Sequence, residues 1–219
     1  MSDKPVLTGP SYAPDSEGPA KQIVIFLHGV GANGDDLIGL APVLSRSLPN
    51  TQFLAPNAPE PCDMGPFGYQ WFSLQDRSPS AIESGVRASA DLVNKFIDDS
   101  CELYNVEPNK VALFGFSQGC MMSLFVGLRR ERALAAILGY SGTLVAPEKL
   151  SNEIVSRPPV LLVHGEEDQV VPFHMFERAK AGLLSAGVDV NALSRPGLGH
   201  GIDEEGLGKG LELLVNQLL

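Results

Sequence analysis

Continuous apolar runs alternate with helical patterns along most of this chain, and this alternation restricts its fold more than any other feature. Residues 22–27 (QIVIFL), 111–116 (VALFGF) and 160–164 (VLLVH) are apolar without interruption, which is typical of strands covered on both faces. Residues 79–104 instead space their apolar side chains three and four apart, as an amphipathic helix does. Strands that alternate with helices predict a mostly parallel central sheet with helices on both faces.

The remaining segments extend the same alternation. We expect further strands at 51–55, 133–140 and 188–194, and further helices at 35–47, from 118 to about 130, at 172–186 and towards 219. The first 20 residues contain four prolines and predict an irregular arm, with one short edge strand near residues 6–8. The sequence therefore predicts an irregular arm over residues 1–20 and a single α/β domain over residues 21–219.

Composition and charge exclude several classes of protein. The chain is 44% hydrophobic and 19% charged, which is ordinary for a globular protein. Its formal net charge of −10 argues against nucleic acid and anionic membranes as partners. The first residues lack an apolar signal segment, and no run approaches the ~18 apolar residues of a membrane span. The three cysteines are widely spaced and odd in number, which does not indicate a disulfide framework. We expect a cytoplasmic protein that does not span a membrane, and a homodimer is left open.

Ser117 lies between two glycines at the junction of a predicted strand and a predicted helix. The stretch reads Gly115-Phe116-Ser117-Gln118-Gly119. Glycine tolerates a tight turn because it has no Cβ, and the serine Oγ would be exposed at the positive end of the following helix. This pattern is typical of a nucleophile elbow. A glycine-rich turn with an incidental serine fits the same five residues.

A serine hydroxyl needs a base before it can act as a nucleophile. The chain has four histidines, and His200 stands in a glycine-rich loop between the last strand and the last helix. From that loop an imidazole can reach across the carboxyl edge of the sheet. His28, His164 and His174 are expected to be structural.

A catalytic histidine also needs an acid that fixes its tautomer. The loop after residues 160–164 offers Glu166, Glu167 and Asp168. We choose Asp168 because it lies furthest along the loop and an apolar Val-Val-Pro anchor follows it. The alternative is that all three acids are solvated and Asp168 caps a helix. The chain order Ser117, Asp168, His200 resembles that of α/β-hydrolases.

Four motifs resemble the phospholipase/carboxylesterase family, which includes acyl-protein thioesterases and bacterial carboxylesterases. They are LHGVGANG at 27–34, GFSQG at 115–119, HGEEDQVVP at 164–172 and GLGHG at 197–201, and QWFS at 70–73 is similar to a further family element. The resemblance covers nearly the whole chain from about residue 7. It implies an α/β-hydrolase fold with Ser117 as nucleophile, Asp168 as acid and His200 as base. It also implies an oxyanion hole made by the backbone N–H groups of Val30 and Gln118.

The resemblance further implies a serine carboxylesterase that cleaves carboxylic ester, thioester or lysophospholipid bonds through an acyl-enzyme, without metal or cofactor. The substrate is then an acyl ester of a small molecule or lipid, or an acylated protein. One alternative is an acyl-protein thioesterase and another is a non-catalytic binding protein of the same fold. A thiol hydrolase would need a cysteine at the elbow, whereas Cys120 follows Ser117 by three residues. Eukaryotic thioesterases of the family typically have Leu where Val30 stands, which bears on the substrate.

The long irregular stretch at residues 56–72 is the candidate substrate-contacting loop. Its candidate side chains are Met64, Phe67 and Trp71. The alternative is that these residues cover the edge of the sheet. The segment at 142–159 is too short for a helical cap domain, so we expect an open site.

Overall fold

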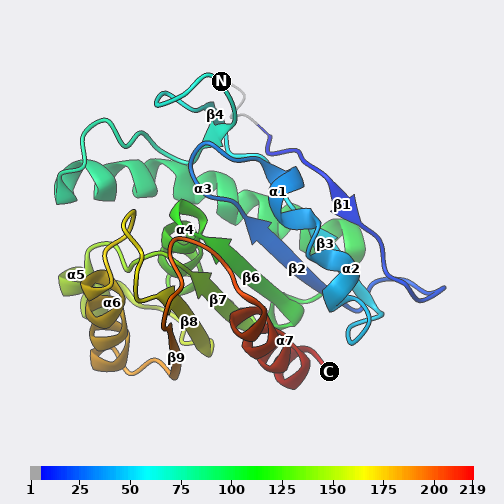
Figure 1. Ribbon diagram of the computed structural model, residues 1–219. Helices are drawn as coiled ribbons and strands as arrows, with labels where there is room; N and C mark the ends of the chain where they lie inside the picture. Colours follow the sequence, from blue (N-terminus) through cyan, green and yellow to red (C-terminus); the bar gives the residue numbers. More distant parts are fainter. Residues whose placement is uncertain (1–5) are drawn as a thin grey trace.

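A seven-stranded sheet forms the centre of the computed structural model, which describes residues 6–219 (Figure 1). The strand order is β1-β3-β2-β6-β7-β8-β9, and every neighbouring pair is parallel except β1 with β3. The strands are β1 Ser11–Tyr12, β2 Gln22–Leu27, β3 Thr51–Leu54, β6 Val111–Phe116, β7 Ala136–Tyr140, β8 Val160–Gly165 and β9 Val190–Arg195. The predicted mostly parallel sheet is confirmed.

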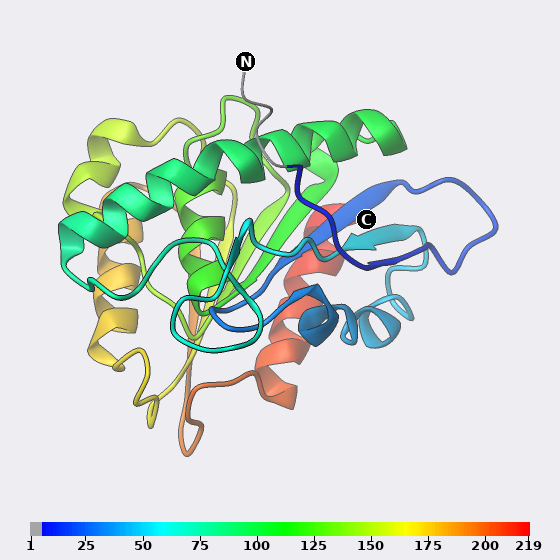
Figure 2. The same cartoon turned by 90° about the horizontal axis from the view of Figure 1, so that it is seen from above.

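Helices cover both faces of this sheet (Figure 2). One face carries α1 Gly34–Ile38, α2 Ala41–Leu44 and α7 Glu204–Leu218. The other carries α3 Pro79–Tyr104, α4 Gln118–Gly127, α5 Pro147–Glu153 and α6 His174–Ser185. A 3₁₀ turn at Pro108–Lys110 precedes β6, and a small hairpin pairs β4 Glu60–Pro61 with β5 Tyr69–Gln70.

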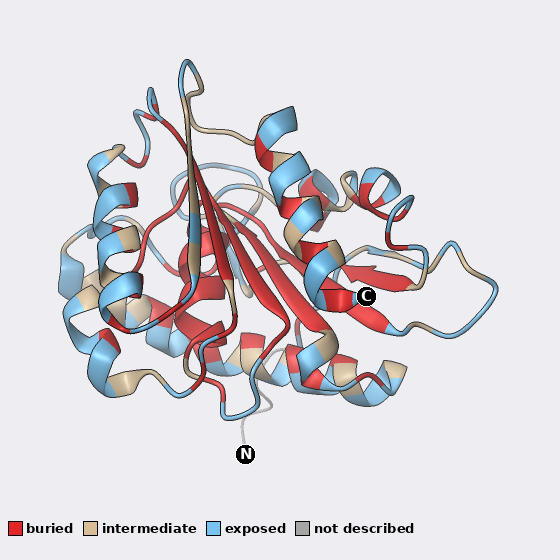
Figure 3. Ribbon diagram, turned by 90° about the horizontal axis from the view of Figure 1, so that it is seen from below, coloured by how far each residue is buried: buried red, intermediate tan, exposed pale blue. Residues whose placement is uncertain are grey.

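The central strands are buried on both faces, as their uninterrupted apolar sequences require (Figure 3). In β2, Ile23 and Ile25 pack in the cluster under α3 and α4. Val24 and Phe26 pack in the cluster under α1, α2 and α7. Each such side chain stabilises the fold by about 1.5–3 kcal/mol through burial.

Two local expectations are wrong. The helix expected at 35–47 is divided into α1 and α2, because Pro42 lacks the N–H that a continuous helix would use there. The edge strand lies at residues 11–12 rather than 6–8. Pro10 has no N–H and cannot donate a strand hydrogen bond. The chain before β1 therefore makes isolated hydrogen bonds instead of a strand: the carbonyl of Pro10 accepts the N–H of residue 55, and the carbonyl of Thr8 accepts the N–H of residue 57. The division into an arm at 1–20 and a domain at 21–219 stays a prediction, and residues 1–5 lie outside the described residues.

Six parallel strands end at one edge of the sheet, and the loops that follow them bring the motif residues there. These loops begin at residues 28, 55, 117, 141, 166 and 196. In open α/β sheets this carboxyl edge is where ligands bind. Between β7 and β8 the chain inserts only the seven-residue helix α5, so nothing in that segment forms a cap domain. Within residues 6–219, no helix combines the length and the apolar character needed to cross a membrane.

Candidate active site

Ser117 occupies a strained turn that the two flanking glycines make possible. Its φ of 54° and ψ of −115° lie in a region that costs a non-glycine residue about 1–3 kcal/mol. A Cβ on Gly119 would lie 1.8 Å from the carbonyl oxygen of Leu27, and one on Gly115 would lie 2.3 Å from that of Gly119. Only glycine therefore fits at either position, and the Ser117 N–H is fixed to the Tyr140 carbonyl at 2.8 Å.

The structure brings Ser117, Asp168 and His200 into one hydrogen-bonded chain. His200 Nε2 lies 3.0 Å from Ser117 Oγ, and His200 Nδ1 lies 2.7 Å from Asp168 Oδ2. Since a carboxylate only accepts hydrogen bonds, Nδ1 carries the proton and Nε2 is free to accept from the serine hydroxyl. Ser117 is only 5% exposed, less than expected, because the imidazole lies against it. Glu166 and Glu167, the two acids considered beside Asp168, point into solvent.

Three N–H donors hold the Asp168 carboxylate. Its Oδ1 accepts the N–H groups of Val170 and Val171, each at 2.8 Å. Its Oδ2 accepts from His200 and also lies 3.4 Å from His164 Nε2. His164 Nε2 is 2.8 Å from the Val171 carbonyl, so this nitrogen carries a proton, and burial lowers the pKa of the imidazole. Neutral His164 therefore supports the acid loop through its buried side chain.

The loop that carries His200 is fixed at several points. An ion pair at 2.7 Å joins Arg195 to Asp203 across the base of the loop. Ser141 Oγ donates to the carbonyl of Gly201 at 3.0 Å, and the Phe116 ring lies 4.9 Å from the imidazole. Sequence reasoning missed Ser141, whose only signal was its place directly after β7 at the same sheet edge.

The loop after β2 passes directly beside the serine. A Cβ on Gly29 would lie 3.3 Å from Ser117 Cβ, and the next residue is Val30. The N–H of Gly31 donates to the Tyr69 carbonyl at 2.8 Å and so fixes this loop. Gln118 is the first residue of α4, where backbone N–H groups have no intrahelical acceptor and carry the positive end of the dipole. The role of Val30 and Gln118 as oxyanion donors stays a prediction.

The Gln118 side chain has a separate structural role, which the sequence did not predict. Its Oε1 accepts the Trp71 N–H at 2.8 Å, and its Nε2 donates to the Phe72 carbonyl at 2.7 Å. This amide clamp, made by Gln118 with residues 71–72, fastens the end of the 56–72 stretch to the start of α4. A polar amide at the start of a mostly apolar helix was the available signal, since buried amides are almost always hydrogen-bonded.

The three candidate substrate contacts lie in different surroundings. Trp71 is 1% exposed and its Nε1 donates to the His28 carbonyl at 2.9 Å, so its ring belongs to the core. Phe67 is 82% exposed and Met64 is 49% exposed, and with Val30 they line a hollow of about 380 Å³. Met64 and Phe67 therefore have surface available for a substrate, whereas Trp71 has almost none.

His28 and Cys120 are unsuited to catalysis in this setting. His28 Nδ1 donates to the Gly29 carbonyl at 2.7 Å, and Nε2 accepts the Ala58 N–H at 3.0 Å. Both nitrogens are thus used, and burial lowers the pKa of this imidazole. Burial raises the pKa of the Cys120 thiol to about 12, so it is protonated at neutral pH. The structure gives no support to a thiol nucleophile at Cys120.

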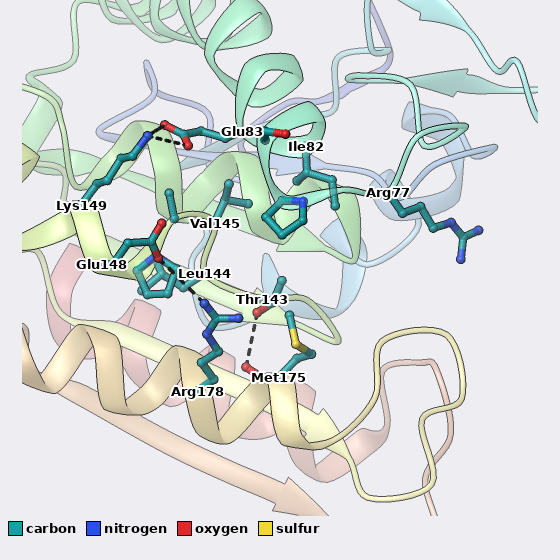
Figure 4. A pocket seen from close by; sticks show the side chains of 14 residues that line it. Arg77, Ile82, Glu83, Thr143, Leu144, Val145, Glu148, Lys149, Met175 and Arg178 are labelled. Carbon is teal, nitrogen blue, oxygen red and sulfur yellow. Dashed lines mark hydrogen bonds and ion pairs between the residues drawn. The ribbon is translucent and has the colours of Figure 1, made fainter.

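An apolar groove lies on the face of the sheet that carries α3 and α6 (Figure 4). We call it the α3–α6 groove; its volume is about 370 Å³, and its apolar lining includes Ile82, Leu144, Val145, Pro147 and Met175. A Cβ on Gly142 would lie 2.8 Å from the Ser117 carbonyl oxygen, and the following residue, Thr143, lines the groove. At one end of the groove Lys149 pairs with Glu83 at 2.8 Å. Sequence reasoning did not predict this groove.

A parallel sheet with Ser117, Asp168 and His200 meeting at its carboxyl edge in this chain order defines an α/β hydrolase. The sequence profile of the Phospholipase/Carboxylesterase family matches residues 13–215, and the chain belongs to that family.

Named relatives agree with this assignment. The chain is 32% identical over 193 residues to acyl-protein thioesterase 1 of Schizosaccharomyces pombe, covering 83% of this chain and 84% of the relative. It is 29% identical over 202 residues to esterase YpfH of Escherichia coli, covering 90% of this chain and 83% of the relative. The crystal structure of esterase PE8 superposes with a TM-score of 0.93 at 41% identity, covering 97% of this chain and 100% of that one.

Proposed function

We propose that Ser117 is the nucleophile, His200 the general base and Asp168 the orienting acid of an enzyme that hydrolyses carboxylic esters. The observation that carries this proposal is the pair of contacts at 3.0 Å and 2.7 Å that joins the three side chains. Esterase activity itself is supported by the family and by the named relatives.

The reaction has two acyl transfers. His200 Nε2 takes the proton of Ser117 as Oγ bonds to the ester carbonyl carbon, and the same proton passes to the leaving oxygen or sulfur when its bond to carbon breaks. A water molecule then gives a proton to His200 and adds to the acyl-enzyme. The proton returns to Ser117 Oγ as the acid is released, so no proton or electron is left over.

The negative oxygen of each tetrahedral intermediate needs donors. The N–H groups of Val30 and Gln118 supply them in this proposal, supported by the close approach of the β2 loop to Ser117 and by the position of Gln118 as the first residue of α4. One such donor typically accounts for about 10²–10³ in turnover.

The α3–α6 groove is the proposed site for the acyl chain. Its apolar lining starts one residue from a backbone contact with Ser117 and suits an aliphatic chain. An acyl-protein thioesterase is the second candidate function, favoured by the 32% identity to the Schizosaccharomyces pombe enzyme of that name. A non-catalytic binding protein is disfavoured, because no member of the triad is missing or displaced.

Labelling with a fluorophosphonate probe and hydrolysis of p-nitrophenyl esters test the proposal together. The wild-type chain is expected to label at Ser117 and to hydrolyse the esters, while Ser117→Ala does neither and keeps its circular dichroism spectrum. Thioesters with the same acyl chains distinguish the two candidate functions. Labelling at another residue, or full turnover by Ser117→Ala, would refute the assignment.

The cellular setting is also a proposal. We propose a cytoplasmic enzyme, supported by the fact that its three cysteines, all within the described residues, are unpaired. Its acidic charge disfavours nucleic acid as a partner. A homodimer stays a proposal that sedimentation velocity tests.

A further inference from the structure

A second apolar hollow lies on the opposite face of the sheet from the α3–α6 groove. We call it the α1–α7 hollow, because it lies between α1 and the segment that leads into α7. Its volume is about 380 Å³, and its apolar lining includes Leu37, Leu40, Phe116 and Ile202. Figure 1 shows α1 and α7 on the same face of the sheet.

This hollow borders the triad on the side of His200. The Phe116 ring that lines it lies 4.9 Å from the imidazole, and Ile202 follows His200 by two residues. Gly29 also lines it, and a Cβ on that residue would lie 3.2 Å from the Phe116 ring and 3.3 Å from Ser117 Cβ. The reacting serine therefore lies beside residues that line this hollow.

The direction of proton transfer indicates which part of an ester each of the two apolar sites would bind. In an ester, the acyl chain and the alcohol part leave the carbonyl carbon in different directions. The leaving atom must lie near His200 Nε2, because it takes the proton from that nitrogen. We propose that the α1–α7 hollow binds the alcohol or thiol part of the substrate, and that this part is apolar and uncharged. This inference rests on the proposed triad.

The charge at the hollow supports the same substrate class. Asp36 is the one acidic residue in the lining, and its Oδ2 accepts the Asn33 N–H at 2.9 Å, which fixes the carboxylate in place. His28, the other titratable lining residue, is held neutral by its burial, which lowers its pKa, and by the Ala58 N–H that its Nε2 accepts. The hollow thus offers a negative charge and no positive one, which disfavours phosphate-bearing leaving groups.

A pair of acetate esters tests the inference. Ethyl and benzyl acetate share the acyl group and have leaving alcohols of similar basicity, but only benzyl alcohol can fill the hollow. Burial of the phenyl ring is expected to favour benzyl acetate in kcat/KM by about tenfold. In Leu40→Asp this ratio is expected to fall close to one. Leu40 is only partly buried and lies at the N-terminal end of α2, where a negative charge is tolerated, so this variant is compatible with folding.

Val43→Asp is the matched control. It introduces the same side chain three residues away on α2, at a half-exposed position outside the hollow, and the wild-type ratio is expected to persist. Ile202→Ala provides a second lining variant, whose ratio is expected to fall as well. An unchanged ratio in both lining variants would overturn the inference.

Two further measurements separate the outcomes. Lining variants that change selectivity between ethyl acetate and ethyl octanoate, and leave the benzyl-to-ethyl ratio alone, would assign the hollow to the acyl chain and overturn the inference. Fluorophosphonate labelling of the same samples reports on Ser117 independently, so that an absence of labelling in the wild type counts against the proposed function instead.

The charge at the hollow is tested separately. Asp36→Asn is expected to raise kcat/KM for 4-acetoxybenzenesulfonate relative to phenyl acetate by about threefold; no rise would contradict the charge argument.

Discussion

The substitution Asp168→Asn has a consequence that follows from the contacts of its two oxygens. Oδ1 accepts the N–H groups of Val170 and Val171, so the asparagine oxygen must take that position, because an NH₂ there would face two donors. The NH₂ group is then turned towards His200 Nδ1. An NH₂ can only donate, so Nδ1 must become an acceptor and the proton must move to Nε2. In this tautomer His200 cannot accept the proton of Ser117.

The expected magnitude follows from this change of tautomer. Loss of the correct tautomer in a Ser-His-Asp site costs about 10⁴ in kcat, which corresponds to about 5.4 kcal/mol of transition-state stabilisation. Folding should suffer much less, because both backbone N–H groups keep their acceptor. We expect a loss of unfolding free energy of about 1 kcal/mol.

Hydrolysis of p-nitrophenyl butyrate and urea unfolding, measured on the same preparation, check both numbers. Glu167→Gln is the matched control, since this exposed carboxylate lies in the same loop and is expected to keep its turnover. Refutation would consist of a kcat within tenfold of wild type for Asp168→Asn, or of equal losses in the two variants.

Three other outcomes are expected. Gln118→Ala breaks the amide clamp and leaves two buried backbone groups at residues 71–72 unpaired, which costs about 1–3 kcal/mol for each in urea unfolding; wild-type stability would contradict this. Ser141→Ala removes the hydrogen bond to the Gly201 carbonyl and so frees one end of the loop that carries His200. The loss of about 1.4 kcal/mol should lower kcat about tenfold while KM stays within twofold. An unchanged kcat would count against a positioning role for Ser141. Burial lowers the pKa of His28 and of His164, so the unfolded chain binds more protons below its own histidine pKa of about 6.5. The free energy of unfolding should therefore have its full value above that pH and decrease below it, and the decrease should be smaller in His28→Gln. An equal pH dependence in the wild type and in His28→Gln would show that His28 does not contribute to this decrease.

Local sequence patterns predicted the sheet and the motif residues because their physical causes are local. Strands buried on both faces must be apolar throughout, and a serine in a strained turn needs glycine at positions 115 and 119. The chain order of the motifs was also sufficient to select three residues that the structure shows in contact.

What the sequence did not predict depends on contacts between distant segments. Gln118 bonds to residues 71–72 across more than forty positions, and Ser141 bonds to Gly201 across sixty. Neither partner leaves a periodic pattern. The burial of Trp71 has the same origin, since an aromatic residue within an irregular stretch fits a substrate contact and a core position equally well.

The amide clamp gives the 56–72 stretch a fixed base, beyond which the tip of the stretch is exposed. The base is bonded to Gln118 through the buried residues 71–72 and joined by the β4–β5 pairing, whereas the tip carries the exposed side chains of Met64 and Phe67. Changes at the tip can therefore accumulate without displacing the first turn of α4. Such a loop is suited to rapid divergence, because new substrate preferences can arise in a lineage while the reacting groups keep their geometry.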